Sequence, residues 1–352
     1  MNVPDWLPLL AWLFGFPLAV SWLLTALLIR WAPRLGLVDY PSERKVHTQP
    51  TPRGGGLAIF AAATLLPYLL PSIFDSQSSI FDYQYLLSAL IFLVGLFDDL
   101  RPLPWPIRLT VHFAAAIVAV LFCLPPRPWF LRAAAVVWIA GLINAFNMLD
   151  NMDALSGGVA WIAAGFLAVL SWLATASSVS EWGPFVILMG SLSGFLWFNR
   201  PPARIFMGDA GSTFLGFMLG LGSVQVALGF GAPPWSWLVP PCILAVPCYD
   251  LLSVVLLRLS QGRSPFHADK QHLSHRLVNR GLSKWMAVRV IYLLALASGT
   301  SGMIIYVVRD WTTAGLIIGQ LAVWWIALAV MEFATKEHRH DTQAQNAGKT
   351  GL

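Results

Sequence analysis

Long apolar runs alternate along the chain with short segments rich in proline, glycine and charged residues. Each run is about 14–24 residues long, and a helix needs about 20 residues to cross the hydrocarbon core of a bilayer. The pattern therefore predicts about eleven membrane-spanning helices, the shortest of them extended by a few flanking residues. The runs lie at 9–30, 55–73, 84–97, 109–124, 130–147, 154–176, 184–198, 212–231, 234–257, 286–308 and 313–333.

The first and ninth runs carry further signals. The segment from Leu9 to Arg30 is longer than a signal-peptide core and follows no basic residue, so we expect a retained helix. The ninth run contains Pro240, Pro241 and Pro247. Because proline removes helix hydrogen bonds, these residues predict a kinked or broken span.

The composition agrees with this pattern. Of the 352 residues, 57% are apolar and 11% are charged, whereas about 25% of a soluble domain is charged. These values exclude a soluble or disordered chain and leave no room for a separate soluble domain. We predict an all-α polytopic membrane protein with one helical bundle over residues 1–334 and a polar, disordered tail over 335–352. Cys123, Cys242 and Cys248 lie in apolar segments and are interpreted as packing residues.

The basic residues predict the orientation. Arg127, Arg132 and Arg309 fall in loops after even-numbered spans, whereas the other nineteen of the 22 Lys and Arg residues fall on the opposite side. The positive-inside rule therefore puts the N-terminus outside and the C-terminus in the cytoplasm. The excess of positive charge also favours anionic substrates at the inner face.

Acidic residues gather on the same predicted face. Carboxylates at a membrane edge are costly and suggest a function, although a single one is as easily a solvated helix end. Two adjacent carboxylates repel each other unless a cation joins them, and Mg²⁺ or Mn²⁺ prefers such oxygen ligands, often together with substrate phosphates. The five residues are Asp98, Asp99, Asp150, Asp153 and Asp209.

The segment 206–212 suits phosphate chemistry. Gly208 and Gly211 allow close backbone approach, and Asp209 offers an oxygen ligand. Ser212 is expected to begin the next helix, whose N-terminal amides favour an anion.

A polar stripe ends the fifth predicted helix. Asn144, Asn147, Asp150 and Asp153 recur every three residues and so share one side of a helix. Contacts between helices are an alternative explanation for the asparagines, but they do not explain the two aspartates. The functional interpretation places Asn147 beside Asp209 as a metal ligand, with Asp150 and Asp153 near a nucleotide.

Two basic loops complete the set. The loop 39–56 carries Lys45 and Arg53, and its glycines at 54–56 suit an oxyanion, although the loop is also explained as a positive-inside anchor. The loop 264–277 places His272, His275 and Arg276 within about one helical turn, which suits a diphosphate or a sugar hydroxyl. A zinc site built from His267, Asp269, His272 and His275 is a weaker alternative, because the spacing is unusual.

Together these motifs resemble the polyprenyl-phosphate N-acetylhexosamine-1-phosphate transferases, the family of WecA-like and MraY-like bacterial enzymes. The similarity runs in order from about residue 39 to residue 283. It includes the loop ending at 50–55, the Phe97-Asp98-Asp99 motif, the 144–155 segment, the 206–209 metal motif and the loop 264–277, called the histidine loop below. The 144–155 segment is similar to the pattern NxxNxxDGxDGL.

The resemblance implies an enzyme that transfers a sugar 1-phosphate from a UDP-sugar to polyprenyl (undecaprenyl) phosphate and releases UMP, with Mg²⁺. It implies the first membrane step of cell-envelope polysaccharide synthesis, in the bacterial inner membrane with the active site facing the cytoplasm. Homodimerisation is a family expectation.

The resemblance also implies residue roles. Asp209 binds the metal, with Asn147 sharing it. Asp98 deprotonates or orients the lipid phosphate, with Asp99 beside it. Asp150 and Asp153 lie near the uridine, whereas Arg108 stands where relatives often carry Lys.

Three positions depart from the family pattern. Glycine is expected where Asn151 and Ala154 stand, so this turn either differs or holds a left-handed Asn. Ser274 replaces the middle histidine of the HxHH cluster. The residues 266–272 look more like the N-acetylglucosamine branch than the muramoyl-pentapeptide branch. The muramoyl-pentapeptide enzyme, an inactive relative and a transporter with ion-binding carboxylates near its midplane remain as alternatives.

Overall fold

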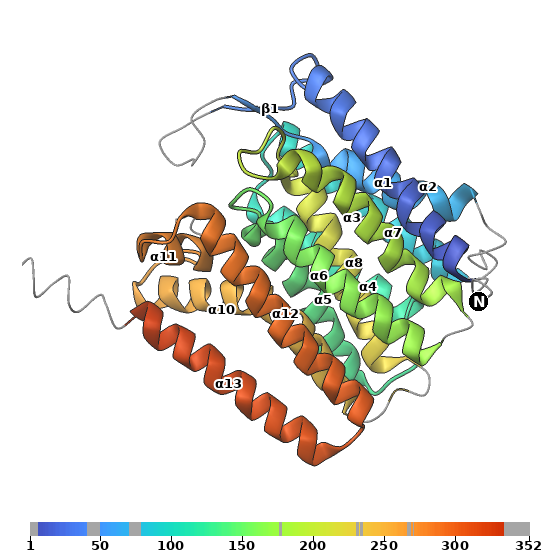
Figure 1. The fold of residues 1–352 in the computed structure, drawn as a ribbon, viewed down its shortest axis with the longest axis vertical. Coiled ribbons are helices and arrows are strands. Elements are labelled where there is room, and N and C mark those ends of the chain that lie inside the picture. The colour runs from blue at the N-terminus through green and yellow to red at the C-terminus, as the bar shows by residue number, and fades with distance from the viewer. Residues whose placement is uncertain are drawn as a thin grey trace, which may run out of the picture.

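The chain forms a bundle of helices in a computed structural model that describes residues 6–40, 50–69, 79–175, 178–229, 232, 235–265, 269 and 271–333 (Figure 1). The long helices run side by side, and a short strand pair lies at one end of the bundle. The helices are α1 (Trp6–Trp31), α2 (Gly55–Leu69), α3 (Ser79–Leu100), α4 (Trp105–Phe122), α5 (Trp129–Leu149), α6 (Leu155–Ala174), α7 (Val179–Asn199), α8 (Gly208–Leu228), α9 (Val239–Ile243), α10 (Ala245–Ser260), α11 (Leu273–Asn279), α12 (Lys284–Val308) and α13 (Trp311–Phe333), with a 3-10 turn at Ser236–Leu238.

The expected polytopic architecture is confirmed. In the described part of the chain, nine helices are long and apolar enough to cross a membrane, or ten if one bent pair forms a single span. The remaining predicted span corresponds to α2, which has 15 described residues. The bent pair is the proline-rich ninth run, in which Ser236–Ile243 and Ala245–Ser260 meet at 71°. The prediction of a broken helix there is confirmed.

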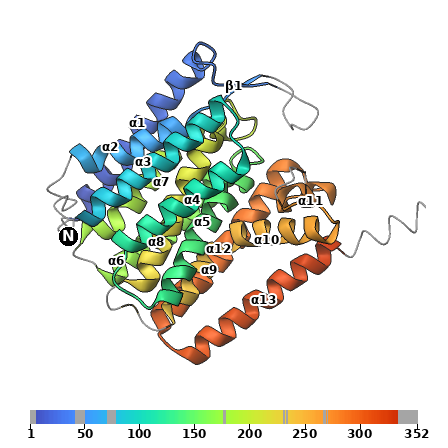
Figure 2. The same ribbon diagram turned by 180° about the vertical axis from the view of Figure 1, so that it is seen from behind.

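Helix α8 forms the centre of the bundle. Of its membrane-spanning window, 89% is buried, and α2, α3, α5 and α6 pack around it (Figures 1 and 2). Small residues permit this packing, because a Cβ atom added at Gly216 would lie 2.5 Å from the Leu142 carbonyl oxygen of α5. Close approach of backbones is how membrane helices gain packing energy without a hydrophobic driving force between them.

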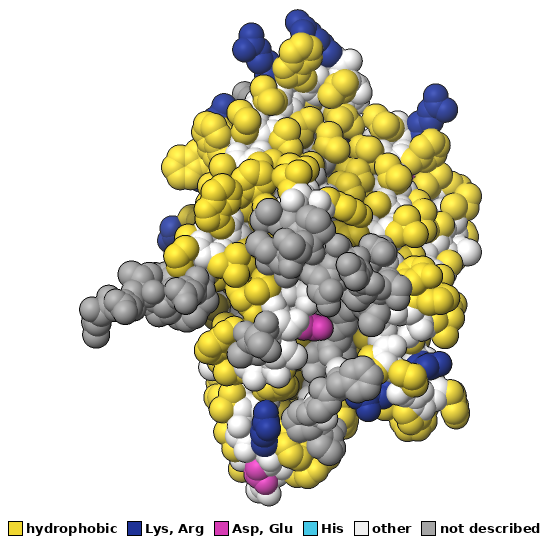
Figure 3. Space-filling model, turned by 90° about the vertical axis from the view of Figure 1, so that its right-hand side faces the viewer, with side chains coloured by type: hydrophobic (Ala, Val, Ile, Leu, Met, Phe, Trp, Pro, Cys, Tyr) yellow, Lys and Arg dark blue, Asp and Glu magenta, His cyan; other side chains and the backbone are white. Residues whose placement is uncertain are grey.

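The surface of the bundle is apolar. Hydrophobic side chains cover much of the face in Figure 3, and most Lys and Arg side chains visible there lie toward its margins. Helix α13 packs against α12 at the edge of the molecule, and only 11% of its membrane-spanning window is buried (Figure 2). Such a helix is stable only with lipid around it.

The first loop is attached to the start of α8. Strands β1 (Val38–Asp39) and β2 (Thr51–Pro52) pair in antiparallel fashion, and Arg53 forms a parallel bridge with Phe206. The Phe206 amide donates to the Pro52 carbonyl at 2.8 Å, and the Gly56 amide donates to the Met207 carbonyl at 2.9 Å. This pairing brings a loop from the N-terminal part of the chain to Asp209.

Candidate active site at one end of the bundle

Asp99 fixes the first turn of α8. Its two carboxylate oxygens accept hydrogen bonds from the Asp209 amide at 2.8 Å and the Ala210 amide at 3.0 Å. A carboxylate at a helix N-terminus is stabilised by the exposed amides and the helix dipole. Asp99 therefore joins the end of α3 to the start of α8 through a capping contact.

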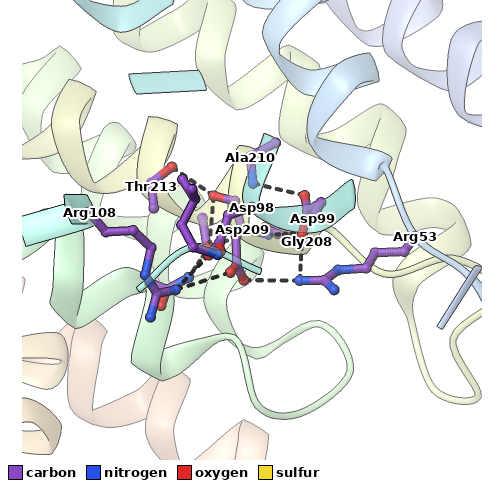
Figure 4. Close-up of polar contacts among 11 residues, drawn as sticks. Arg53, Asp98, Asp99, Arg108, Gly208, Asp209, Ala210 and Thr213 are labelled. Carbon is purple, nitrogen blue, oxygen red and sulfur yellow. Dashed lines mark hydrogen bonds and ion pairs between the residues drawn. The ribbon is translucent and has the colours of Figure 1, made fainter. Parts of the chain in front are cut away.

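Two arginines connect the three neighbouring carboxylates (Figure 4). Arg53 Nη2 lies 2.5 Å from Asp99 Oδ1 and 3.2 Å from Asp209 Oδ1. Arg108 Nη1 lies 2.6 Å from Asp98 Oδ2 and 3.5 Å from Asp209 Oδ2. Asp209 therefore stands between two cations from different parts of the chain.

These contacts keep Arg53 positively charged and fix the position of the Asp98 carboxylate. Burial opposes the charge of Arg53, but Asp99 and Asp209 outweigh it and raise the pKa of the guanidinium. The Asp98 carboxylate also accepts from the Leu103 amide at 2.6 Å, so both of its oxygens are held.

Glycine is required at the start of α8. Gly208 has a φ of +80°, and an added Cβ atom would lie 2.6 Å from Asp99 Oδ2. The expected close backbone approach at Gly208 is confirmed. The expected helix start is wrong, because α8 begins at Gly208 and Ser212 lies a turn later, donating to the Gly208 carbonyl at 3.1 Å.

The glycine run at 54–56 has a different role from the one expected. The amides of Gly54 and Gly55 donate to the Phe206 carbonyl, and that of Gly56 donates to Met207. These amides are therefore used in holding the first loop against α8, so the predicted oxyanion site is wrong. Lys45, the other predicted cation of this loop, lies outside the described residues.

The predicted polar stripe does not continue along one helix, because α5 ends at Leu149 and both Asp150 and Asp153 lie beyond it. Asn144 donates to the Ala140 carbonyl of its own helix at 2.8 Å. Asn147 faces α8, where its amide donates to Ser212 Oγ at 3.3 Å, one turn from Asp209. Asp153 accepts from the Ala203 amide at 3.0 Å.

Asp150 follows the last residue of α5 and lies on a cavity. Burial raises the pKa of Asp150 to about 7, and the negative charge of Asp209 acts in the same direction.

The cavity has a volume of about 450 Å³, within the range of small-molecule sites. It brings together residues from the first loop, the segment after α5, the start of α8 and the histidine loop. Its lining is Asp39, Arg53, Asp150, Asn151, Met152, Asp153, Asn199, Pro201, Phe206, Gly208, Asp209, Asp269, His272, His275, Lys284 and Val288.

The histidine loop contributes unequally to this cavity. His272 and His275 line it, and His272 Nδ1 lies 2.8 Å from Asp250 Oδ2. Arg276 instead donates to Ser253 Oγ of α10 at 2.8 Å and lies over the Tyr249 ring. The structure therefore brings the two histidines to the site but places the Arg276 side chain on α10, away from the cavity lining.

The alternative zinc site gains no support from these contacts. The Asp269 carboxylate lies 3.1 Å from Arg258 Nε. Although burial opposes ionisation, the hydrogen bonds from Arg258 and the Gln271 amide hold the pKa of Asp269 below its usual range. His267 and Lys270 lie outside the described residues, and within the described ranges no three His, Cys, Asp or Glu side chains form a group that could hold a metal.

The turn after α5 explains one departure from the family pattern. Ala154 has a φ of +62°, in the left-handed region, whereas Asn151 does not. Asn199 Oδ1 accepts from the Ala154 amide at 2.9 Å, and the Tyr292 hydroxyl donates to its carbonyl. Of the two alternatives, the left-handed Asn151 is therefore excluded, and the left-handed residue of this turn is Ala154.

Sequence reasoning missed Lys284, Asn199 and Asp250. Lys284 and Asn199 line the cavity from helix ends, where polar residues are common and carry little signal. Asp250 stands within the ninth apolar run, and a carboxylate in such a run is itself a reason to suspect a function.

Comparisons with known proteins identify the family of this chain. The family model for glycosyl transferase family 4 matches residues 83–227. A probable undecaprenyl-phosphate N-acetylglucosaminyl 1-phosphate transferase of Bacillus subtilis is 31% identical over 309 residues, covering 84% of each chain. This chain belongs to glycosyl transferase family 4.

Two further relatives have the same kind of name. A decaprenyl-phosphate N-acetylglucosaminephosphotransferase of Mycobacterium tuberculosis is 32% identical over 337 residues, covering 85% of this chain and 83% of the relative. An undecaprenyl-phosphate alpha-N-acetylglucosaminyl 1-phosphate transferase of Escherichia coli is 29% identical over 302 residues, covering 78% and 77%. The family segment contains all five aspartates singled out above, whereas the histidine loop follows it.

Proposed function

We propose that this protein transfers N-acetylglucosamine 1-phosphate from UDP-N-acetylglucosamine to a polyprenyl phosphate, releasing UMP. The observation that carries the proposal is the position of Asp209, between Arg53 and Arg108 at the rim of a cavity in a membrane bundle. The names of the relatives, which cover most of this chain, support a polyprenyl phosphate acceptor and a transferred N-acetylglucosamine phosphate group.

The donor atoms at the site fit Mg²⁺. Asp209 supplies oxygen ligands, which Mg²⁺ prefers, and this ion needs only one or two carboxylates because it keeps several waters. Asn147 uses its amide nitrogen on Ser212, and no hydrogen bond to its Oδ1 oxygen is seen among the described residues. Asp209 would hold the ion, with Asn147 Oδ1 beside it. When bound, Mg²⁺ would supply positive charge to the diphosphate oxygens.

The residues of the chain have separate tasks in this proposal. Phosphoryl transfer depends on positioning and on neutralising charge on the transferred group. Arg53 and Arg108 provide that charge from two sides of Asp209. Asp98, held by Arg108 and the Leu103 amide, orients the lipid phosphate and accepts its proton. Asp150, Asp153 and the two histidines line the cavity for the nucleotide sugar.

The site lies where two phases meet. Asp98 and Asp99 end α3 and Asp209 begins α8, so the acceptor can arrive between helices while the nucleotide enters from water. The distribution of Lys and Arg supports a cytoplasmic site in a bacterial inner membrane.

Release of UMP by purified protein tests the proposal. Reactions contain Mg²⁺, polyprenyl phosphate and either UDP-N-acetylglucosamine or UDP-N-acetylmuramoyl-pentapeptide. We expect UMP with the first nucleotide alone. UMP with the second alone would assign the chain to peptidoglycan synthesis, and no UMP from folded protein with either would contradict the proposal.

A further inference from the structure

Asp250 of α10 is wholly buried, and both of its carboxylate oxygens have partners. The residue is 0% exposed to solvent. Oδ1 accepts from the Leu273 amide at 2.6 Å, and Oδ2 lies 2.8 Å from Nδ1 of His272. Asp250 therefore holds one end of the histidine loop through two contacts. One is to the backbone amide of Leu273, and the other is to the ring of His272, which lines the cavity.

The contact between Asp250 Oδ2 and His272 Nδ1 decides how the ring is protonated. A backbone amide is always a donor, and a carboxylate offers only acceptors, so Asp250 Oδ2 requires a proton on His272 Nδ1. The other ring nitrogen, Nε2, then either accepts a hydrogen bond or, in the cationic ring, donates one. A hydrogen bond at one ring nitrogen sets the chemistry of the other in this way in many histidine sites.

Other residues of α10 hold the same loop. Arg258 Nε and Nη2 lie 3.1 and 3.2 Å from the Asp269 carboxylate, and Ser253 accepts from Arg276. Gln261, the C-cap of α10, exchanges side-chain hydrogen bonds with Gln271 at the surface. Of these α10 residues, Asp250 alone contacts the ring of a histidine that lines the cavity, in the described part of the chain.

We propose that Asp250 is a positioning residue for nucleotide-sugar binding. It fixes His272 in the form with a proton on Nδ1 and aims Nε2 at the sugar or diphosphate, without touching the substrate itself. This inference rests on the proposed function, because it assigns the cavity to the nucleotide sugar.

The variant Asp250→Asn tests the idea with little change in shape. Its Oδ1 can still accept from Leu273, but its Nδ2 then faces Nδ1 of His272 and donates to it. The ring must move its proton to Nε2, so Nε2 presents a donor where the neutral ring of the wild type presents an acceptor. We expect KM for the UDP-sugar to rise by about 10- to 100-fold, the range for a hydrogen bond to a charged group, with KM for polyprenyl phosphate unchanged.

Gln261→Ala is the matched control. It removes a surface contact between the same helix and the same loop, so we expect wild-type KM values for both substrates. A purely structural role for Asp250 would instead lower the yield of folded protein or reduce kcat while leaving the UDP-sugar KM unchanged, and either result would overturn the proposal.

Nitrogen NMR provides a readout that does not depend on activity or on the folding of the Asp250→Asn variant. Wild-type protein labelled with ¹⁵N-histidine, compared with the His272→Gln variant, identifies the two ring nitrogens of His272. We expect the proton on Nδ1 in the wild type, and a proton on Nε2 alone would overturn the proposal. Wild-type protein without transferase activity would instead contradict the proposed function and leave the proton position as a separate result.

Discussion

Ser274 Oγ donates a hydrogen bond of 2.6 Å to Asn151 Oδ1, across 123 residues of sequence. Both residues replace those expected from the family pattern, glycine at 151 and histidine at 274. The two departures therefore contact each other and join the turn after α5 to the histidine loop. Asn151 lines the cavity and Ser274 is buried, so the hydrogen bond ties a cavity-lining residue to the buried start of α11.

The first prediction is that these two residues are energetically coupled. We expect Asn151→Gly and Ser274→Ala each to lower the free energy of unfolding, with a coupling of about 1 kcal/mol in the double variant. Thermal unfolding of the four purified proteins measures it. Additive effects would show that the hydrogen bond contributes nothing.

The second prediction concerns Ala154. Its left-handed backbone costs about 1–2 kcal/mol for a residue with a Cβ atom, partly offset by the greater unfolded-state freedom of glycine. Ala154→Gly should therefore stabilise the protein by about 1 kcal/mol. The matched change Ala160→Gly, at a buried site in the middle of α6, should destabilise it. A lower melting temperature for Ala154→Gly would contradict this account.

The third prediction concerns the close approach at Gly208. Gly208→Ala places a methyl group 2.6 Å from Asp99 Oδ2 and must move the start of α8. We expect activity to fall by about 100-fold, because small displacements at a reacting centre have effects of this size. Gly220→Ala, in the same helix, is the control, since a Cβ atom there lies 3.4 Å from its nearest neighbour, the Cα atom of Ile139 on α5. Equal activity in both variants would remove Gly208 from the site argument.

The fourth prediction concerns Asp209. Asp209→Asn removes the charge between the two arginines, so turnover and its Mg²⁺ dependence should be lost while the protein stays folded. Asp310→Asn is the control, because Asp310 lies between α12 and α13 and is hydrogen-bonded to Thr313. Titration of activity against Mg²⁺ measures both, and an unchanged Mg²⁺ profile in Asp209→Asn would exclude the metal role.

The fifth prediction concerns pH. The pKa of Asp150 is about 7 in the folded protein but about 3.9 in an unfolded chain. The folded state therefore binds more protons in this interval, so the contribution of Asp150 to stability falls as the pH rises from about 4 to about 7. Without Mg²⁺, Asp150→Asn should melt higher than the wild type at pH 8 and equally at pH 4. The same difference at both pH values would show that ionisation of Asp150 is not the cause.

The helices and most of the site were predictable from the sequence because their signals are local. Apolar runs specify spans by length, and aspartates at the ends of such runs stand out against their surroundings. The broken ninth span follows from Pro240, Pro241 and Pro247 in the same way.

The remaining features depend on contacts between distant residues. The amides of Gly54 and Gly55 form backbone hydrogen bonds with Phe206, which no local pattern predicts. Arg276 follows the cavity-lining His275 in the sequence, but its side chain contacts Ser253 of α10. The role of Asp250 cannot be predicted from the sequence, because it depends on the contact between α10 and His272 in the fold.

The central claim is that a sugar phosphate, rather than a sugar alone, moves to the lipid. The most direct test gives the wild-type protein UDP-N-acetylglucosamine labelled with ³²P at the phosphate attached to the sugar, together with polyprenyl phosphate and Mg²⁺. We predict that the label enters the lipid fraction in equal amount to the UMP released. Release of UDP, with the label remaining in water while sugar appears in the lipid, would contradict the account.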